Sequence, residues 1–205
     1  MRAPAEHEVK PAALPRKTGS LSNRIMAIAA GWITILLLVG GLTLDRTLTN
    51  LITSQFDTQL NYKLTALVSS AEVGPDGDIF LVRSLGDQRF LEPNSGLYWQ
   101  IRGQGHEDFA SRSLWDASIP VQSDHFDTKP HIFDSTQRPG ETLRVIERTI
   151  ILPDSTTKWW FAVAESRAEL DAQIRQTRSI LLYSFVILGL GLFVMAALQT
   201  WYGLG

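Results

Sequence analysis

The chain has 205 residues and contains 19 Lys and Arg against 21 Asp and Glu, so its formal net charge is −2. This slight acidity gives no support for nucleic-acid binding. There is no cysteine, which excludes a disulfide-stapled fold, so any exported domain must depend on its own apolar core.

Residues 1–23 are rich in proline, alanine and charge, a composition that predicts a disordered tail. Five basic residues precede the first apolar stretch and only two acidic ones do, which gives this segment a net charge of +3. Positive charge beside a membrane span is retained in the cytoplasm, so the tail is expected there. The basic residues are Arg2, Lys10, Arg16, Lys17 and Arg24, and the acidic ones are Glu6 and Glu8.

Two stretches, Ile25–Leu44 and Ile180–Leu198, contain no charged residue. A bilayer core of about 30 Å needs about 20 apolar residues in a helix. We therefore predict membrane-spanning helices at 24–45 and 179–201, in contact with membrane lipid. The alternatives are buried core helices or, for the first stretch, a cleaved signal peptide. The length of the first stretch, and the absence of a small-x-small site in Asp45–Thr47, favour an uncleaved anchor.

Residues 46–178 lie between the two spans, and with both termini in the cytoplasm this segment is expected outside it. Because the whole chain carries −2 and the residues up to Arg24 carry +3, residues 45–178 carry −5. About 130 residues are enough for one apolar core. The sequence therefore predicts a single extracytoplasmic domain held at both ends by the membrane.

The extracytoplasmic segment begins with an amphipathic pattern. Apolar residues recur at steps of three and four, which predicts a helix that continues the first span without a break as far as Glu72. Gly74–Gly77 then marks a turn. The apolar positions are Leu48, Leu51, Ile52, Phe56, Leu60, Leu64, Leu67 and Val68.

Five short segments rich in β-formers follow, and a capped helix closes the domain. Ser166 with Glu169 fits a capping box, which predicts a helix over 166–176 that runs into the second span. The fold class is α+β, with a long helix on an antiparallel sheet. The predicted strands are 79–82, 97–102, 109–114, 143–152 and 158–164, with a long polar loop over 116–141.

Several phrases together resemble the periplasmic part of bacterial two-component sensor histidine kinases. They are SGLYWQI (95–101), SRSLWD (111–116), ETLRVIERTI (141–150), FAVAES (161–166) and the closing QTWYGLG (199–205). The resemblance implies a PAS-like, Cache-type domain, a homodimer in the bacterial inner membrane, and a response regulator as partner. It also implies that 202–205 begin the cytoplasmic linker called HAMP.

Nothing in the chain matches the catalytic part of such a kinase. The four histidines, His7, His106, His125 and His131, do not lie on a helix of the phospho-accepting type. A nucleophile elbow, an HExxH motif and a Gly-rich phosphate loop are also missing. We expect the chain to be the input portion of a longer kinase, without cofactor or catalytic residue of its own. ATP and Mg²⁺ would belong to the kinase domain.

Six residues on or beside the predicted strands are candidates for binding a ligand. Aromatic side chains with a few polar groups are typical of small-molecule sites, and arginine suits an anion. The alternatives are core packing for the aromatic residues and, for the arginines, pairing with nearby carboxylates such as Glu147 or Asp116, or remaining solvated. Of the adjacent Trp159 and Trp160, which face opposite sides of a strand, at most one is expected in the core. The candidates are Trp99, Arg102, Arg112, Trp115, Arg144 and Arg148.

A metal site is a further hypothesis, because imidazole and carboxylate groups recur between 106 and 134. No pair of them has a fixed ligand spacing, so a solvated polar loop is the alternative. The groups are His106, Glu107, Asp108, Asp124, His125, Asp127, His131 and Asp134.

Two other functions fit the same layout. One is the input domain of a chemoreceptor or of a cyclic-dinucleotide enzyme, and the other is a membrane anchor without signalling.

Overall fold

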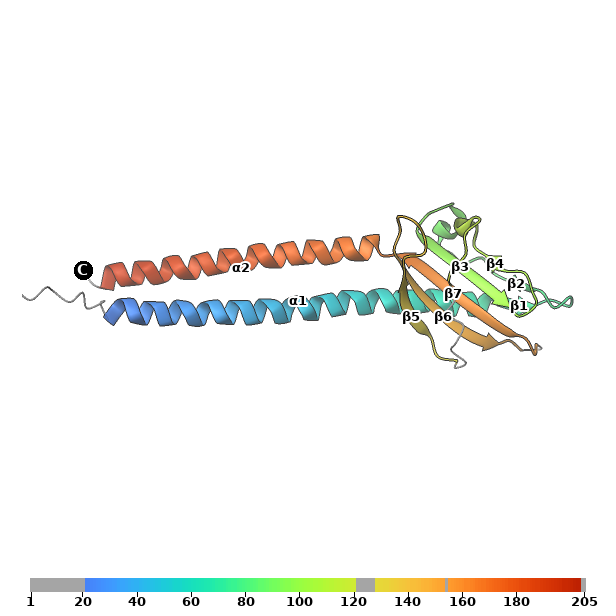
Figure 1. Ribbon diagram of the computed structural model, residues 1–205, viewed down its shortest axis with the longest axis horizontal. Helices are drawn as coiled ribbons and strands as arrows, with labels where there is room; N and C mark the ends of the chain where they lie inside the picture. The colour runs from blue at the N-terminus through green and yellow to red at the C-terminus, as the bar shows by residue number, and fades with distance from the viewer. Residues whose placement is uncertain (1–20, 121–127, 154, 204–205) are drawn as a thin grey trace, which may run out of the picture. The chain divides into compact units, whose positions relative to one another are not determined.

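The structure is a computed structural model that describes residues 21–120, 128–153 and 155–203 (Figure 1). Along the chain, the helix α1 (Leu21–Ser70) precedes all the strands and the helix α2 (Ala168–Gly203) follows them. The chain divides into two units, Leu42–Leu182 and a second formed by Met1–Gly41 with Tyr183–Gly205.

The second unit contains the apolar parts of both helices. Windows within α1 and α2 are long and apolar enough to cross a membrane by length and composition, and neither is buried in protein. Trp32, Leu36, Ile187 and Phe193 are each more than 60% exposed. Side chains of this kind need an apolar solvent, which lipid provides. This exposure argues against the alternative of buried core helices.

The Leu42–Leu182 unit is built on a five-stranded antiparallel sheet in the order β4-β3-β7-β6-β5. β7 lies at its centre and leads into α2. The strands are β3 (Leu97–Gly103), β4 (Phe109–Ala110), β5 (His131–Ser135), β6 (Leu143–Ile151) and β7 (Lys158–Ser166). The α+β class and the antiparallel sheet are confirmed.

Both faces of the sheet are apolar. On one face Leu60, Leu64 and Leu67 of α1 are buried against alternate residues of β3 and β7. Each fully buried leucine stabilises the fold by about 1.5–3 kcal/mol. On the other face Leu114 and Ile119 cover the remaining alternate residues. The predicted amphipathic pattern of α1 is therefore confirmed at these three leucines, whereas Leu51 is exposed.

The expectation that only one of the adjacent tryptophans is buried is wrong. Trp159 packs on the α1 face and Trp160 on the opposite face, and both are buried. The neighbours do point to opposite sides, as strand geometry requires. The expectation failed because segment 111–119 covers the second face, which strand periodicity does not reveal.

Several boundaries also differ from the sequence prediction. α1 ends at Ser70, and β1 (Ala71–Val73) follows where a helix to Glu72 was expected. β1 pairs with β2 (Ile79–Leu81) around the predicted turn, in a hairpin separate from the main sheet. The β-branched Val73 and Ile79 pair across this hairpin, and this pairing replaces the last helical turn.

Two predicted segments change type. The expected strand over 109–114 is two residues of β4, because Arg112–Leu114 form the 3-10 helix η2. The expected loop over 116–141 contains β5, an edge strand paired with β6. Both segments have weak β patterns, and pairing with long neighbouring strands decides their structure.

The predicted capping box is wrong. Ser166 is the last residue of β7, and its hydroxyl accepts a hydrogen bond of 3.4 Å from the backbone N–H of Ala168, the first residue of α2. The first helical bond runs from the N–H of Asp171 to the carbonyl of Arg167. The helix therefore starts two residues later than expected, and from there it continues to Gly203 without a break.

Candidate functional site at the start of the second helix

A carboxylate sits among apolar side chains at the end of β7. Trp159, Phe161 and Val163 point to the α1 face of the sheet and are buried in its core. Glu165 follows in the same alternation, so its side chain also points toward α1 and is only 8% exposed. Burying a charge is costly unless it is paired. The strand pattern therefore requires partners for Glu165.

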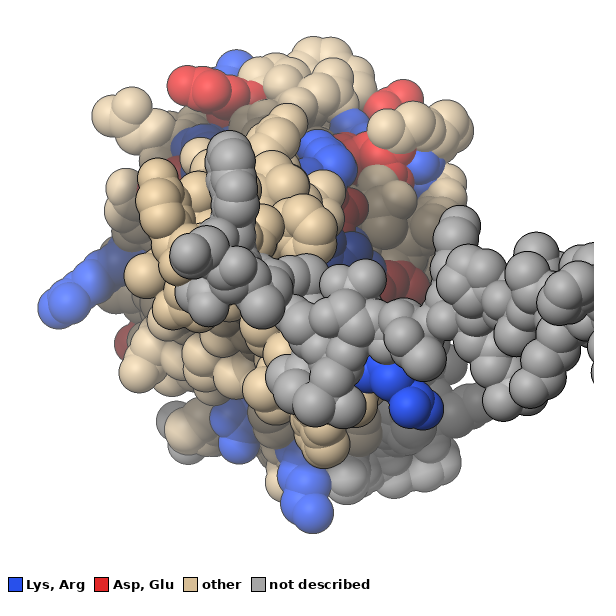
Figure 2. All heavy atoms as spheres, turned by 90° about the vertical axis from the view of Figure 1, so that its left-hand side faces the viewer, with Lys and Arg blue, Asp and Glu red and all other residues tan. Residues whose placement is uncertain are grey.

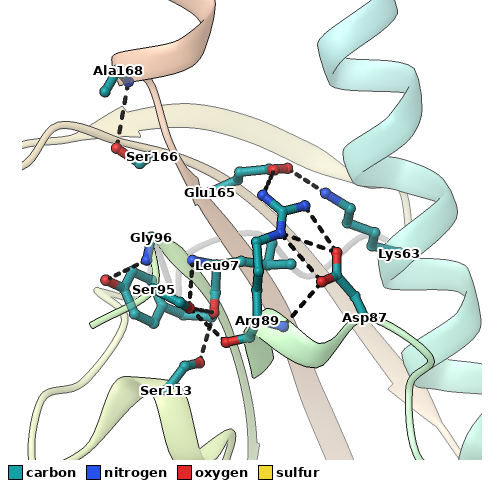
Figure 3. Close-up of polar contacts among 11 residues, drawn as sticks. Lys63, Asp87, Arg89, Ser95, Gly96, Leu97, Ser113, Glu165, Ser166 and Ala168 are labelled. Atoms are coloured by element: carbon teal, nitrogen blue, oxygen red, sulfur yellow. Dashed lines mark hydrogen bonds and ion pairs between the residues drawn. The ribbon is translucent and has the colours of Figure 1, made fainter. Parts of the chain in front are cut away.

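Two cations from distant parts of the chain supply those partners (Figure 3). Lys63 of α1 donates to Oε2 of Glu165 at 2.5 Å, and Arg89 donates from Nη1 to Oε1 at 3.0 Å. Asp87 accepts from Nε and Nη2 of Arg89. We call Lys63, Asp87, Arg89 and Glu165 the Glu165 cluster. It contains two positive and two negative groups, so it is formally neutral.

The short 3-10 helix η1 (Gln88–Leu91) holds Arg89 in place. Asp87 precedes it as N-cap, and its carboxylate accepts from the backbone N–H of Arg89 at 3.1 Å. The Ser95 hydroxyl donates to the carbonyl of Arg89 at 2.6 Å. The hydrogen bond between the two side chains lowers the pKa of Asp87 and raises that of Arg89. Both groups therefore remain charged at neutral pH.

A second group of charges ties α1 to β6. Arg144 is the register partner of Glu165 on the adjacent strand, so it also faces α1. Its Nε and Nη2 both donate to Asp57 at 2.8 Å, a two-pronged pairing that fixes direction as well as distance. Its Nη1 donates to Asp134 of β5 at 3.0 Å. The hydrogen bonds that Arg144 donates to Asp57 raise the pKa of Arg144, which stays cationic.

The same group continues into α2. Asp134 also accepts from Arg167, which lies between β7 and α2, at 2.6 Å, and Arg167 pairs with Asp171 of α2 at 3.2 Å. We call Asp57, Asp134, Arg144, Arg167 and Asp171 the Arg144 cluster. It connects α1, β5, β6 and the first turn of α2 through charged side chains alone.

Together the two clusters set the register of α1 on the sheet. Along α1 the order is negative at Asp57 and positive at Lys63, and on the sheet Arg144 and Glu165 present the opposite order. A shift of the helix by one turn, about 5.4 Å, would separate both pairs. The central strand β7 leads into α2. A change in the register of α1 on the sheet would therefore affect both helices.

We expect the Asp57–Arg144 pair to have a measurable coupling energy. Both side chains are about 20% exposed, so a double-mutant cycle with Asp57→Ala and Arg144→Ala should give about 1–2 kcal/mol. Asp45 and Arg178, also 2.8 Å apart but with Arg178 57% exposed, form the control cycle and should give about 0–0.5 kcal/mol. Urea denaturation in detergent measures both, and equal couplings would contradict a special role for Asp57.

The structure does not bring the six ligand candidates together in one cavity. Trp99 is a core residue on the α1 face, packed edge-on against Phe109 at 5.1 Å between ring centroids. Arg102 lies on the opposite face, paired with Asp108 and 5.6 Å from the Trp160 ring centroid. Hydrogen bonding between Arg102 and Asp108 raises the pKa of the arginine and lowers that of the carboxyl.

The other four candidates have different surroundings. Arg112 in η2 is exposed, and Trp115 just after it is 69% exposed with a φ of +57°. Arg144 and Arg148 share a face of β6, as their spacing predicts. Arg148 donates to the carbonyl of Thr128 at 2.7 Å. Arg144 pairs with the carboxylates of Asp57 and Asp134, so the alternative of carboxylate pairing holds for it, with partners other than Glu147 and Asp116.

Most of the described groups considered for a metal site have other partners. His106 lies 3.3 Å from Asp78 and stacks on Trp159, and Asp108 pairs with Arg102. Asp124, His125 and Asp127 lie outside the described residues. Within the described ranges, no three potential ligands gather into a group that could hold a metal ion.

Sequence reasoning missed most of the residues in the two clusters. Asp57, Lys63, Asp87, Arg89 and Arg167 are not among the candidates that the sequence singles out. A signal for Glu165 was present, because a carboxylate that continues the apolar alternation of Trp159, Phe161 and Val163 predicts a buried ion pair. Its partners lie 102 and 76 residues away and have no such local signal.

Figure 2 shows charge of both signs on the visible part of this face. Blue and red atoms lie beside each other in its upper part, and small separate groups of blue atoms are visible near its lower edge. Nucleic-acid binding depends on an extended basic surface. This face therefore gives no support for such a partner, in line with the net charge of −2.

The first and last helices of this α+β domain extend into apolar stretches of membrane-spanning length. This is the architecture of a transmembrane sensor. Residues 33–177 match the family described as two-component sensor kinase N-terminal, and the chain belongs to this family. Neither curated proteins nor solved structures give a match. The family match supports the expected sensor-kinase relationship and does not favour a chemoreceptor, a cyclic-dinucleotide enzyme or a passive anchor.

Proposed function

We propose that this chain senses a signal outside the cytoplasm and relays it across the membrane to a histidine kinase portion. Residues 24–45 and 179–201 are the spans, and 46–178 form the periplasmic domain. Residues 1–23 and the HAMP-like start at 202–205 are cytoplasmic. The long helix on a five-stranded antiparallel sheet supports a PAS-like, Cache-type assignment of this domain.

One observation carries the relay proposal, namely that α1 and α2 are both tied by charge pairs to the same end of one sheet. Asp57 and Lys63 connect α1, and Arg167 with Asp171 connects the first turn of α2. A stimulus acts only if it binds two arrangements of such an element differently. The hydrogen bonds and ion pairs of the Glu165 and Arg144 clusters are the interactions that would differ between two such arrangements. The kinase acts as a homodimer, uses ATP and Mg²⁺ in its catalytic domain, and phosphorylates a response regulator.

The topology is tested with a single cysteine, since the chain has none of its own. Thr136→Cys, exposed and next to β5, should react in intact cells with a maleimide that crosses only the outer membrane. A cysteine at Ala13 in the tail is the control and should react only after lysis. Labelling of position 136 only after lysis would place the domain in the cytoplasm and end the sensor proposal.

The relay is tested by joining residues 1–205 to the HAMP and kinase portion of a sensor kinase and measuring autophosphorylation in membrane vesicles. Asp57→Ala and Arg144→Ala should each change the basal rate several-fold, because they remove the charge pair between α1 and β6. Glu107→Ala changes an exposed side chain far from both clusters in the sequence and should leave the rate unchanged. Equal rates in all variants would contradict the role of the Arg144 cluster.

A further inference from the structure

A cavity of about 430 Å³ lies between α1 and α2 beside the Glu165 cluster, within the Leu42–Leu182 unit. This volume is at the lower end of the range for small-molecule sites, about 300–1,000 Å³. Ile52, Phe56 and Leu170 form its apolar part. A ligand here would touch both helices and the end of β7 at once.

The polar lining is rich in acceptors. Four carboxamides face the cavity, Gln55 and Gln59 from α1 and Gln173 and Gln176 from α2. None of the four has a side-chain hydrogen bond within the described part of the chain. All four residues are exposed, so a bound molecule would replace water at their amide oxygens, each of which accepts two hydrogen bonds.

The charged lining is negative overall. Glu165 and Glu169 contribute carboxylates and Arg89 the one cation. Arg89 is already engaged by Asp87 and Glu165, so its charge is largely neutralised. Glu169 is exposed and forms no ion pair among the described residues. The carboxylate of Glu169 is therefore available to pair with a cation that binds in the cavity.

Lys63 shows how a primary ammonium binds here, because its Nζ lies 2.5 Å from Glu165 Oε2. We propose that the cavity binds a small organic ammonium ion, an aliphatic amine or diamine. Its ammonium pairs with Glu169 and donates to the glutamine oxygens, and its carbon skeleton lies against Phe56 and Leu170. As an input signal this site rests on the proposed function, but the binding itself does not.

The test uses the full chain in maltoside micelles, which carry no amine. Isothermal titration calorimetry with 1,4-diaminobutane should give saturable heat, and 1,4-butanediol, its neutral counterpart, should give none. Glu169→Gln should weaken the amine by about fivefold or more, as expected for a partly exposed charge pair. Glu107→Gln, an exposed acid elsewhere in the chain, should leave the affinity unchanged.

A second arm separates free amines from lipid headgroups. In nanodiscs containing phosphatidylethanolamine, a weaker apparent affinity for 1,4-diaminobutane would identify the headgroup ammonium as an occupant, and an unchanged affinity would identify a free amine. Absence of heat in micelles, equal binding of the diol, or equal affinity in Glu169→Gln would overturn the proposal. Because no kinase output is measured, a failed titration leaves the relay function standing.

Discussion

Replacing Glu165 by alanine should lower the free energy of unfolding by about 3 kcal/mol, because it leaves Lys63 and Arg89 without the carboxylate that both bind. Lys63 is 21% exposed and Arg89 40%, so water solvates part of the charge that loses its partner. The expected loss in stability therefore lies at the lower end of the range for breaking a buried ion pair. Urea denaturation in detergent, followed by tryptophan fluorescence, measures the change. Glu107→Ala is the control and should stay within about 0.5 kcal/mol of the unmodified chain.

A second variant separates stability from signalling. Lys63→Met with Glu165→Leu replaces the pair by apolar groups and should restore stability to within about 1 kcal/mol, because such replacements remove the desolvation cost together with the attraction. Arg89 keeps Asp87 as its partner. In the kinase fusion, however, this double variant should still show altered autophosphorylation. A normal rate in a stable double variant would mean that the Glu165 cluster serves stability alone.

Gly103→Ala is the second change for which we expect a large effect. A Cβ at this position would lie 2.4 Å from Cζ3 and 2.7 Å from Cε3 of Trp159, whose ring is completely buried. A rigid buried ring cannot move aside without shifting its neighbours, so the loss should be about 2–3 kcal/mol. Gly86→Ala, where a Cβ would meet nothing within 4 Å, is the matched control and should change stability by less than about 1 kcal/mol.

The cause of that loss is checked by shrinking the ring. Trp159→Leu is destabilising by itself, since it leaves a cavity in the core. In the Gly103→Ala background, however, it also removes the clash, so the double variant should be more stable than the sum of the two single losses predicts. A purely additive result in the same denaturation assay would show that strain from the Trp159 ring is not the reason.

The elements that local patterns predicted well are those whose pattern spans many residues. The long helix, the strands at β3, β6 and β7 and the run of α2 into its apolar stretch all follow from periodicity over seven residues or more. The errors fall on short segments, although the short strand predicted at 79–82 is present as β2. Two-residue β4, the 3-10 helix at Arg112 and edge strand β5 take their structure from neighbours far along the chain.

The candidate site divides in the same way. Arg144 is a candidate because strand spacing places it with Arg148 on one face, and pairing with carboxylates is one of its alternatives, but its actual partners Asp57 and Asp134 were not named for it. Asp57 lies 87 residues before it, and no local rule connects a charge on a helix with a charge on a strand at that separation. The ligand candidates Trp99 and Arg102 are likewise separated by strand alternation onto opposite faces of the sheet.

By itself the sequence determined the two apolar stretches, the α+β class and the family, because hydropathy, period and short motifs are local properties of the chain. The tertiary structure alone decided which charges meet. Ion pairing depends on distance in space, and packing of α1 on the sheet brings Lys63 to Glu165 and Asp57 to Arg144. The same packing leaves the amide-lined cavity between the helices, a site made of residues that are individually unremarkable in the chain.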